Sequence, residues 1–222
     1  GKNGLNLCNS SWNCTKMKTR KGTLVGGSLF QYGGGKSLMQ LNTLSMVHDF
    51  LTRTVKPGSV CVDATAGKGR DTALLCRLTG KAGRVLAFDI QEEAIRQTRA
   101  LLEAEGLSAE VVLDSHANLE QYAEPGTVDC VVFNFGRLPG GDPSIFTRSD
   151  TSVAALEAAL RLLKPGGVIA IALYYGGANG YGERDAVMTW LETLDDRKFS
   201  VLRCDWANRR NDPPVPIFIW KE

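Results

Sequence analysis

The chain contains no apolar run near the roughly 18 residues that a membrane-spanning helix needs. Its first residues also lack the pattern of a secretory signal peptide, in which a positively charged segment is followed by an apolar one. Its hydrophobic fraction of 43% and charged fraction of 23% are those of an ordinary globular protein. We therefore expect a cytoplasmic protein without a membrane partner.

Metal-ligand spacing is absent as well. The six cysteines are scattered, with none of the short paired spacings of a zinc site, so no bound metal is expected. Cys61 and Cys130 lie within apolar, strand-like runs, where a reduced thiol behaves as a small core residue. Cys8 and Cys14 would bridge only in an oxidising compartment, which the rest of the chain does not suggest.

Acidic residues are missing from the first part of the chain, where the earliest is Asp49. Residues 1–37 hold six basic side chains and eight glycines, whereas the remainder has 20 basic against 24 acidic residues. We interpret 1–37 as a basic, glycine-rich segment outside a single domain that spans 38–222. It is either an arm that grips RNA phosphates or, more simply, a flexible leader that precedes a native start at Met17.

Apolar periodicity from about residue 40 onward predicts alternating helices and strands. Expected helices cover 41–51, 71–78, 92–105, 151–163 and 183–194, and expected strands cover 59–63, 84–89, 109–113, 128–133 and 168–174. Such alternation is typical of a doubly wound, mostly parallel α/β sheet of the Rossmann-like kind. Two last strands, 199–206 and 215–220, follow one another without a helix, which predicts a C-terminal antiparallel hairpin. This ending favours a class I methyltransferase over most nicotinamide-binding folds.

A glycine-containing turn, Gly67-Lys68-Gly69, leaves the first strand and enters a helix, which is where a backbone approaches a nucleotide closely. A dinucleotide fingerprint would need a third small residue, but Thr72 stands there. Asp63 would repel a pyrophosphate, whereas it suits the ammonium group of S-adenosylmethionine (SAM). SAM is therefore the predicted cofactor.

Asp89 lies 20 residues beyond Gly69 at the end of the second strand, where a carboxylate can accept both ribose hydroxyls. Its alternative role is a helix N-cap. His116, after the third strand, either contacts the adenine or caps the helix that follows. The predicted cofactor residues are Asp63, Thr65, Gly67, Gly69, Asp71, Thr72, Asp89, Gln91, Ser115, His116 and Asn134.

Four stretches together resemble one family of small bacterial proteins. They are Asp63-Ala64-Thr65, Phe88-Asp89-Ile90-Gln91, the run from Asn134 to Asp142, and Asn211-Asp212-Pro213-Pro214. The family is that of the tRNA 5-aminomethyl-2-thiouridine methyltransferases of the MnmM or YtqB type, long labelled rRNA methylases. The resemblance extends from about residue 42 to the C-terminus and departs at Tyr175, where relatives carry a histidine.

The resemblance implies methyl transfer from SAM to the exocyclic amine of a wobble uridine, with the tRNA anticodon region as partner. A homodimer is a further expectation that the sequence leaves open. The implied catalytic residues are Asn134, Asp142 and Tyr175, although Asp142 equally suits an ordinary turn. The predicted RNA contacts are Arg137, Tyr174, Arg209 and Arg210.

Two alternatives to this function are open. Fold does not determine substrate, so an rRNA or small-molecule methyltransferase on the same fold is the first. The second belongs to another functional class and is a non-catalytic RNA-binding protein that retains the fold. For Arg209 and Arg210, the alternative to RNA binding is pairing with Asp205 or Asp212 in a solvated turn.

Overall fold

The computed structural model describes residues 41–136, 149–175 and 180–222. No helix in these ranges is both long and apolar enough to cross a membrane. The helices are α1 (Thr43–Thr54), α2 (Arg70–Thr79), α3 (Glu92–Ala104), the 3₁₀ helix η1 (His116–Gln121), α4 (Ser149–Leu162) and α5 (Gly180–Leu191). The strands are β1 (Val60–Asp63), β2 (Arg84–Asp89), β3 (Glu110–Leu113), β4 (Val128–Phe135), β5 (Leu163–Leu173), β6 (Phe199–Arg203) and β7 (Val215–Lys221).

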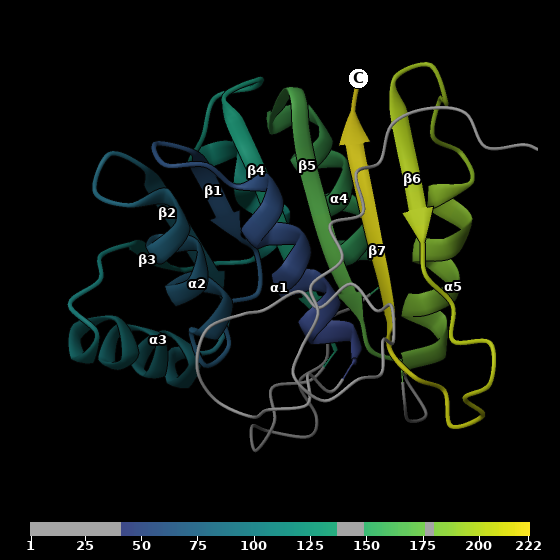
Figure 1. Ribbon diagram of the computed structural model, residues 1–222, viewed down its shortest axis with the longest axis horizontal. Helices are drawn as coiled ribbons and strands as arrows, with labels where there is room; N and C mark the ends of the chain where they lie inside the picture. Colours follow the sequence, from purple (N-terminus) through teal and green to yellow (C-terminus); the bar gives the residue numbers. More distant parts are fainter. Residues whose placement is uncertain (1–40, 137–148, 176–179) are drawn as a thin grey trace, which may run out of the picture. The chain divides into compact units, whose positions relative to one another are not determined.

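These strands form one seven-stranded sheet in the order β3-β2-β1-β4-β5-β7-β6 (Figure 1). Strands β1 to β5 pair in parallel, and β7 is antiparallel to both of its neighbours, β5 and β6. The predicted doubly wound sheet with a C-terminal antiparallel hairpin is confirmed. Strand order reverses between β1 and β4, and open α/β sheets bind ligands beside such a reversal.

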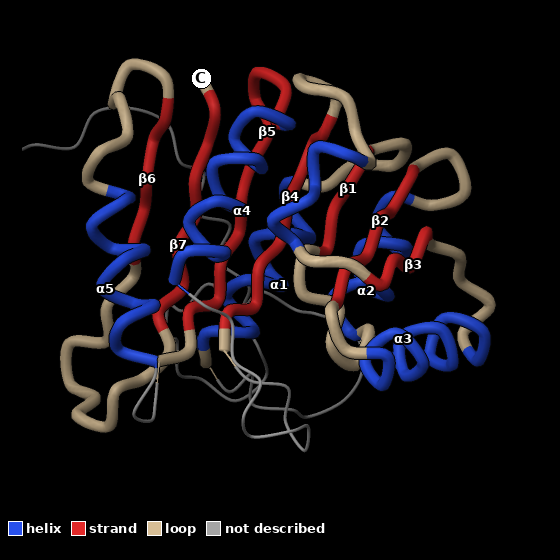
Figure 2. Tube along the Cα trace, turned by 180° about the vertical axis from the view of Figure 1, so that it is seen from behind, coloured by secondary structure: helices blue, strands red, loops and turns tan. Residues whose placement is uncertain are grey.

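Helices cover both faces of the sheet. Helices α1, α2 and α3 lie on one face, and α4 and α5 lie on the other (Figures 1 and 2). Alternate residues of each strand serve the two faces, because successive side chains of a strand point in opposite directions. On β1, Cys61 packs in the cluster that contains Val47 of α1, whereas Val62 packs in the cluster that contains Leu156 of α4. The predicted burial of Cys61 and Cys130 is confirmed.

Some element ends differ from the sequence expectation. Strand β4 continues two residues beyond its predicted end, since Asn134 and Phe135 still pair with Ala172 and Leu173 of β5. Asn134 therefore lies within a strand and not in the loop after it. Strand β6 stops at Arg203, three residues early. The next residue, Cys204, still donates its N–H to the Pro216 carbonyl of β7, but Pro216 has no N–H to donate in return, so the ladder ends there.

Strand β7 depends on burial, whereas its neighbour β6 is exposed. Ile219 is fully buried, while Leu202 on β6 keeps 49% of its surface exposed. Ile219→Ala should lower the free energy of unfolding by about 2–5 kcal/mol, the usual cost of emptying a packed site. Leu202→Ala removes as many carbon atoms and should change it by less than about 1 kcal/mol. Urea unfolding of both variants measures the difference, and similar losses would contradict the described packing.

Candidate active site

The carboxyl ends of the parallel strands bring the predicted residues to one edge of the sheet. Asp63 is the last residue of β1, Asp89 is the last of β2, and Asn134 is the second-last of β4. Tyr174 directly follows β5, and its N–H donates to the Phe135 carbonyl. Since β1 and β4 flank the point where strand order reverses, these side chains surround the crevice expected for a ligand.

Asp63 is completely buried, and two donors hold its carboxylate. Oδ1 accepts the Thr65 N–H at 3.1 Å, and Oδ2 accepts the Thr72 hydroxyl at 2.6 Å. Thr72, which replaces a glycine of the dinucleotide fingerprint, thus attaches the first turn of α2 to the end of β1. Both threonines were predicted cofactor residues, and the structure brings them together with Asp63.

Burial and the nearby charge of Asp71 together raise the pKa of Asp63 to about 7, while the bonds from Thr72 and Thr65 oppose the shift. The ordinary value for this carboxyl is 3.8. A buried anion of this kind is stabilised by a cationic partner, which would lower its pKa again. A ligand ammonium group is suited to that place.

Asp89 is held by the backbone of the loops on both sides of it. Its Oδ2 accepts the Gly67 N–H at 3.0 Å, and its Oδ1 accepts the Gln91 N–H at 2.9 Å. Gln91 occupies the N-cap position of α3, but its own side chain makes no cap bond. A carboxylate has about four acceptor positions, so two hydroxyl groups can still donate to Asp89. Partial burial raises the pKa of Asp89, against the effect of these N–H bonds.

The glycine turn lets α2 approach α3 closely. Gly69 has φ = 77°, and a Cβ on it would lie 2.8 Å from the Thr98 Cα of α3. Gly67 also has a positive φ, of 54°, and its carbonyl accepts the Thr98 hydroxyl at 3.3 Å. A side chain at either position would strain the turn, because φ is positive at both.

Asn134 joins the glycine loop and α2 to β4. Its backbone N–H donates to Thr65 Oγ1 at 2.7 Å, and its side-chain Nδ2 donates to Asp71 Oδ2 at 2.9 Å. The other oxygen of Asp71 lies 2.6 Å from His48 Nε2 of α1. Asp71 was predicted to bind the cofactor, whereas the structure directs both of its oxygens to protein groups.

His48 is the site residue that the sequence analysis missed. The periodicity of α1 suggested only a packing position for it, and Asp71 lies 23 residues further along the chain. A histidine within an otherwise apolar helix stripe was the one available signal.

Ser115 and His116 take different roles after β3. The Ser115 hydroxyl accepts the Ala117 N–H, so Ser115 caps η1 and the alternative cap role of His116 is wrong. The His116 ring is buried edge-on against Phe133 and Phe135. Burial lowers the pKa of His116 to about 4, so its ring is neutral near pH 7. Among the described residues, its buried Nε2 has no hydrogen-bond partner.

The two tyrosines after β5 differ in exposure. Tyr174 is 38% exposed, and burial of its other part together with the charge of Asp71 raises the pKa of its hydroxyl. Tyr175 is buried, with its ring packed edge-on to Tyr181 and beneath the Arg184 guanidinium of α5. The described contacts of Tyr175 are thus packing contacts, and its catalytic role stays a prediction.

Gly136 is a further residue that the sequence analysis passed over. Its φ is 145°, and a Cβ there would lie 2.9 Å from the Tyr174 Cβ. The chain leaves β4 at this glycine and enters the segment that carries the predicted Arg137 and Asp142. Both of those residues lie outside the described residues.

The loop between β6 and β7 reaches the same edge of the sheet, because β6 runs in the direction of β5. Arg209 donates to the Leu41 carbonyl at 3.0 Å, and its guanidinium lies 3.7 Å from the Trp206 ring centre. The two carboxylates considered as alternative partners of Arg209 and Arg210 bind other groups. Asp205 pairs with Arg203, and Asp212 accepts the Tyr181 hydroxyl. Arg210 is exposed.

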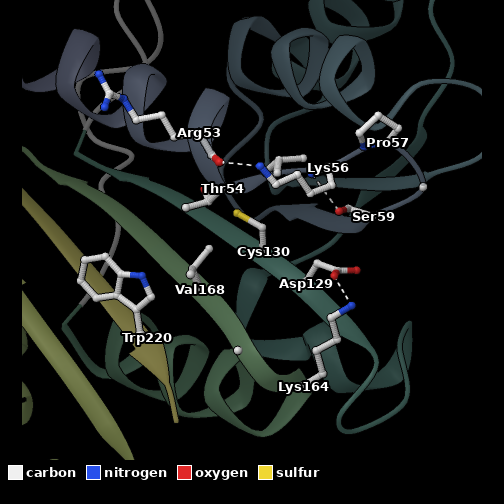
Figure 3. Close-up of a pocket in the computed structure, with 13 residues that line it drawn as sticks. Arg53, Thr54, Lys56, Pro57, Ser59, Asp129, Cys130, Lys164, Val168 and Trp220 are labelled. Carbon is white, nitrogen blue, oxygen red and sulfur yellow. Dashed lines mark hydrogen bonds and ion pairs between the residues drawn. The ribbon is translucent and has the colours of Figure 1, made fainter. Parts of the chain in front are cut away.

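A hollow of about 470 Å³ lies at the opposite edge of the sheet, at the amino ends of β1 and β4 (Figure 3). Lys164 on its rim pairs with Asp129, and Lys56 Nζ donates to the Arg53 carbonyl at 2.9 Å. The strand ends here are amino ends, where α/β sheets rarely place ligands. We therefore assign the active site to the Asp63 edge.

The residues at the Asp63 edge fit SAM on three observations. Asp63 is a buried carboxylate that a cation would stabilise, and Asp89 has acceptor positions left for two ribose hydroxyls. His116 presents an unpartnered ring nitrogen to a hydrogen-bonding base such as adenine. The glycine turn joins the first two of these groups, since the Thr65 N–H donates to Asp63 and the Gly67 N–H donates to Asp89.

Comparison with known proteins agrees with this geometry. Residues 85–220 match the family model described as "Putative rRNA methylase". The chain is 35% identical over 187 residues to the chloroplastic tRNA (mnm5s2U34)-methyltransferase of Arabidopsis thaliana. That alignment covers 79% of this chain and 68% of the plant protein.

Two solved structures share both fold and sequence with the chain. A protein of the same description from Clostridium thermocellum is 42% identical with a TM-score of 0.81, over 83% of this chain and 100% of that one. A Streptococcus mutans protein in complex with S-adenosylhomocysteine (SAH) is 34% identical with a TM-score of 0.75, over the same shares. The chain therefore belongs to this rRNA methylase family and is a SAM-dependent enzyme with the class I methyltransferase fold.

Proposed function

We propose that this enzyme transfers the methyl group of SAM to the exocyclic primary amine of 5-aminomethyl-2-thiouridine at the wobble position of tRNA. The observation that carries the proposal is the place of Asn134 near the carboxyl end of β4, where its N–H donates to Thr65 and its carboxamide is held by Asp71. The activity for which the Arabidopsis relative is named, methylation of that tRNA position, supports the same substrate. The anticodon region is then the part of tRNA that enters the site.

The reaction is a displacement at carbon. The lone pair of the neutral amine forms the new N–C bond. The electrons of the broken C–S bond remain on sulfur, so that SAH is the second product. The methylated amine is at first cationic, and it loses one proton to water or to a nearby base. The protein's main contribution is alignment, since holding both reactants in line replaces an encounter between free molecules.

Each part of the cofactor has a protein partner in this proposal. Asp63 would bind the ammonium of the amino-acid end, and Asp89 would accept the ribose hydroxyls. His116 Nε2, as the acceptor of a neutral ring, would accept a hydrogen of the adenine amino group. Ile90 follows Asp89, is 56% exposed, and would cover one face of the adenine ring.

RNA would enter between the loop after β6 and the end of β5. Arg209 is fixed by Trp206 and the Leu41 carbonyl, so it supports the loop, while the neighbouring Arg210 is free to reach phosphate. Tyr174 presents an exposed ring on which a base can stack. Arg137, Asp142, association into a homodimer and a cytoplasmic location remain predictions.

Ribosomal RNA is the second candidate substrate. The description of the matching family favours it, and the geometry of the methyl-transfer site suits any accessible amine. The two candidates differ in which RNA accepts the methyl group.

The raised pKa of Asp63 predicts pH-dependent cofactor binding. As the pH falls below about 7, the free enzyme protonates Asp63, and a neutral carboxyl no longer attracts the ligand ammonium. An α-amino group with a pKa of about 7.7 stays charged throughout this range. The affinity for SAH should therefore fall by up to about tenfold per pH unit between pH 7 and 5.5. Calorimetric titration measures it.

Asp63→Asn is the matched control for this titration. It keeps the shape of the side chain but has no charge to lose, so its SAH affinity should be weak and nearly constant over the same pH range. A wild-type affinity that does not change between pH 7.5 and 5.5 would contradict the assignment of Asp63 to the ammonium group.

The substrate is tested with methyl-labelled SAM and two RNA pools. One is tRNA from cells that accumulate 5-aminomethyl-2-thiouridine, and the other is ribosomal RNA. We expect label in tRNA alone, with nucleoside mass spectrometry showing one added methyl group on that uridine. Asn134→Ala should transfer about 10²-fold more slowly, because an aligning group is lost. Label confined to ribosomal RNA would exclude the tRNA proposal.

Arg210 should contribute to RNA affinity and not to cofactor binding. Arg210→Ala removes one phosphate contact, so the slope of log affinity against log salt should flatten by about one unit. Arg77→Ala is the control, because Arg77 is an exposed arginine in the last turn of α2, at the other edge, where it pairs with Glu105. Filter binding of tRNA at several salt concentrations measures both, and equal slopes for Arg210→Ala and wild type would refute the assignment.

A further inference from the structure

Three polar side chains from three elements form a hydrogen-bonded chain behind the methyl-transfer site. His48 Nε2 of α1 lies 2.6 Å from Asp71 Oδ1 of α2, and Asp71 Oδ2 lies 2.9 Å from Asn134 Nδ2 of β4. The Asp71 side chain is 7% exposed and that of His48 is 32% exposed. Asp71 is thus enclosed between two partners, with His48 on the solvent side.

The chemistry of these groups determines which way the carboxamide points. A carboxylate only accepts hydrogen bonds, so the NH₂ group of Asn134 must face Asp71 and its oxygen must face elsewhere. His48 must likewise present Nε2–H to Asp71, which leaves Nδ1 as the acceptor of a neutral ring. Among the described residues, no group donates to the Asn134 side-chain oxygen.

We propose that His48 and Asp71 are positioning residues that hold the Asn134 carboxamide with its oxygen toward the methyl acceptor. The inference rests on the proposed function for the identity of that acceptor, a primary amine. An oxygen in this place accepts an amine hydrogen and leaves the nitrogen lone pair free to point at the methyl carbon. The reverse orientation would present N–H groups, which would bind that lone pair and block the reaction.

This role differs from the cofactor contact that the sequence predicts for Asp71. Each Asp71 oxygen is bonded to a side chain of another element, and these two bonds hold the carboxylate between α1 and β4. Loss of either positioning residue should therefore slow turnover more than it weakens cofactor binding.

A reciprocal exchange of side chains tests the orientation. In Asp71→Asn, the oxygen of the new amide accepts from His48 and its NH₂ faces Asn134, which must turn its own oxygen inward. We expect kcat to fall by about 10²-fold. Asn134→Asp alone places two carboxylates against each other and should also be slow. The double variant restores a donor–acceptor pair and an outward oxygen, so its kcat should exceed that of Asp71→Asn by about tenfold.

His48 is tested by two replacements. His48→Gln keeps an N–H donor near the position of Nε2 and should retain kcat within about threefold, whereas His48→Ala should lose about tenfold. SAH affinity should stay within about threefold in both. The control is Thr52→Ala on the exposed side of α1, and it should behave as wild type. Within the described part of the chain, the Thr52 hydroxyl bonds only to the His48 backbone carbonyl.

Each opposite outcome overturns the proposal. A double variant no faster than Asp71→Asn would remove the orientation argument. His48→Gln as slow as His48→Ala would make the imidazole itself necessary, and a loss of SAH affinity equal to the loss of kcat would return Asp71 to the cofactor site. Wild-type enzyme that is inactive on the tRNA would instead refute the proposed function.

If the enzyme is inactive on the tRNA, a measurement that needs no substrate still tests the orientation of Asn134. In protein with ¹⁵N-labelled asparagine and bound SAH, one Asn134 Nδ2 proton should exchange slowly with solvent, and Asp71→Asn should abolish the protection. Fast exchange of both protons in the wild type would overturn the inference.

Discussion

A carboxylate without solvent contact, Asp63, ends the first strand of the sheet, and its need for hydrogen-bond donors organises the site around it. The Thr72 hydroxyl and the Thr65 N–H supply two donors, which attach α2 and the glycine turn to β1. These bonds offset burial only in part, so the pKa of Asp63 remains near 7. In the proposed binding mode, a cationic ligand would supply the remaining stabilisation of Asp63, and cofactor binding would thereby complete this edge of the sheet.

The segment from Thr65 to Thr72 also bonds to Asn134, the residue that the proposed function places next to the methyl acceptor. Thr65 uses its N–H on Asp63 and its hydroxyl oxygen on the Asn134 N–H, and Asp71, one residue before Thr72, holds the Asn134 carboxamide. In the proposed function, one loop and one helix end would thus align both cofactor and acceptor. Because in-line transfer is sensitive to small displacements, a shared support for both reactants is a physical advantage.

The C-terminal hairpin adds a surface for a large substrate. Since β7 is inserted antiparallel between β5 and β6, the loop after β6 returns to the edge that holds the cofactor. Outside residues 1–37 acidic residues outnumber basic ones, so the few arginines of this loop have to act locally. Stacking on Trp206 gives Arg209 a defined position, which an arginine in a solvated turn would lack.

The sequence alone determined the order of the elements, the reversed last strand and the placing of Asp63 and Asp89 at strand ends, because periodicity and strand alternation are local properties. It also indicated Asn134, although as a loop residue. Only the tertiary structure decided that Asp71 binds His48 and Asn134, that Ser115 is the cap, and that Tyr175 is packed against α5. The partners of Asp71 lie 23 and 63 residues away along the chain. No local pattern encodes a hydrogen bond across such separations, because it depends on how helices and strands pack.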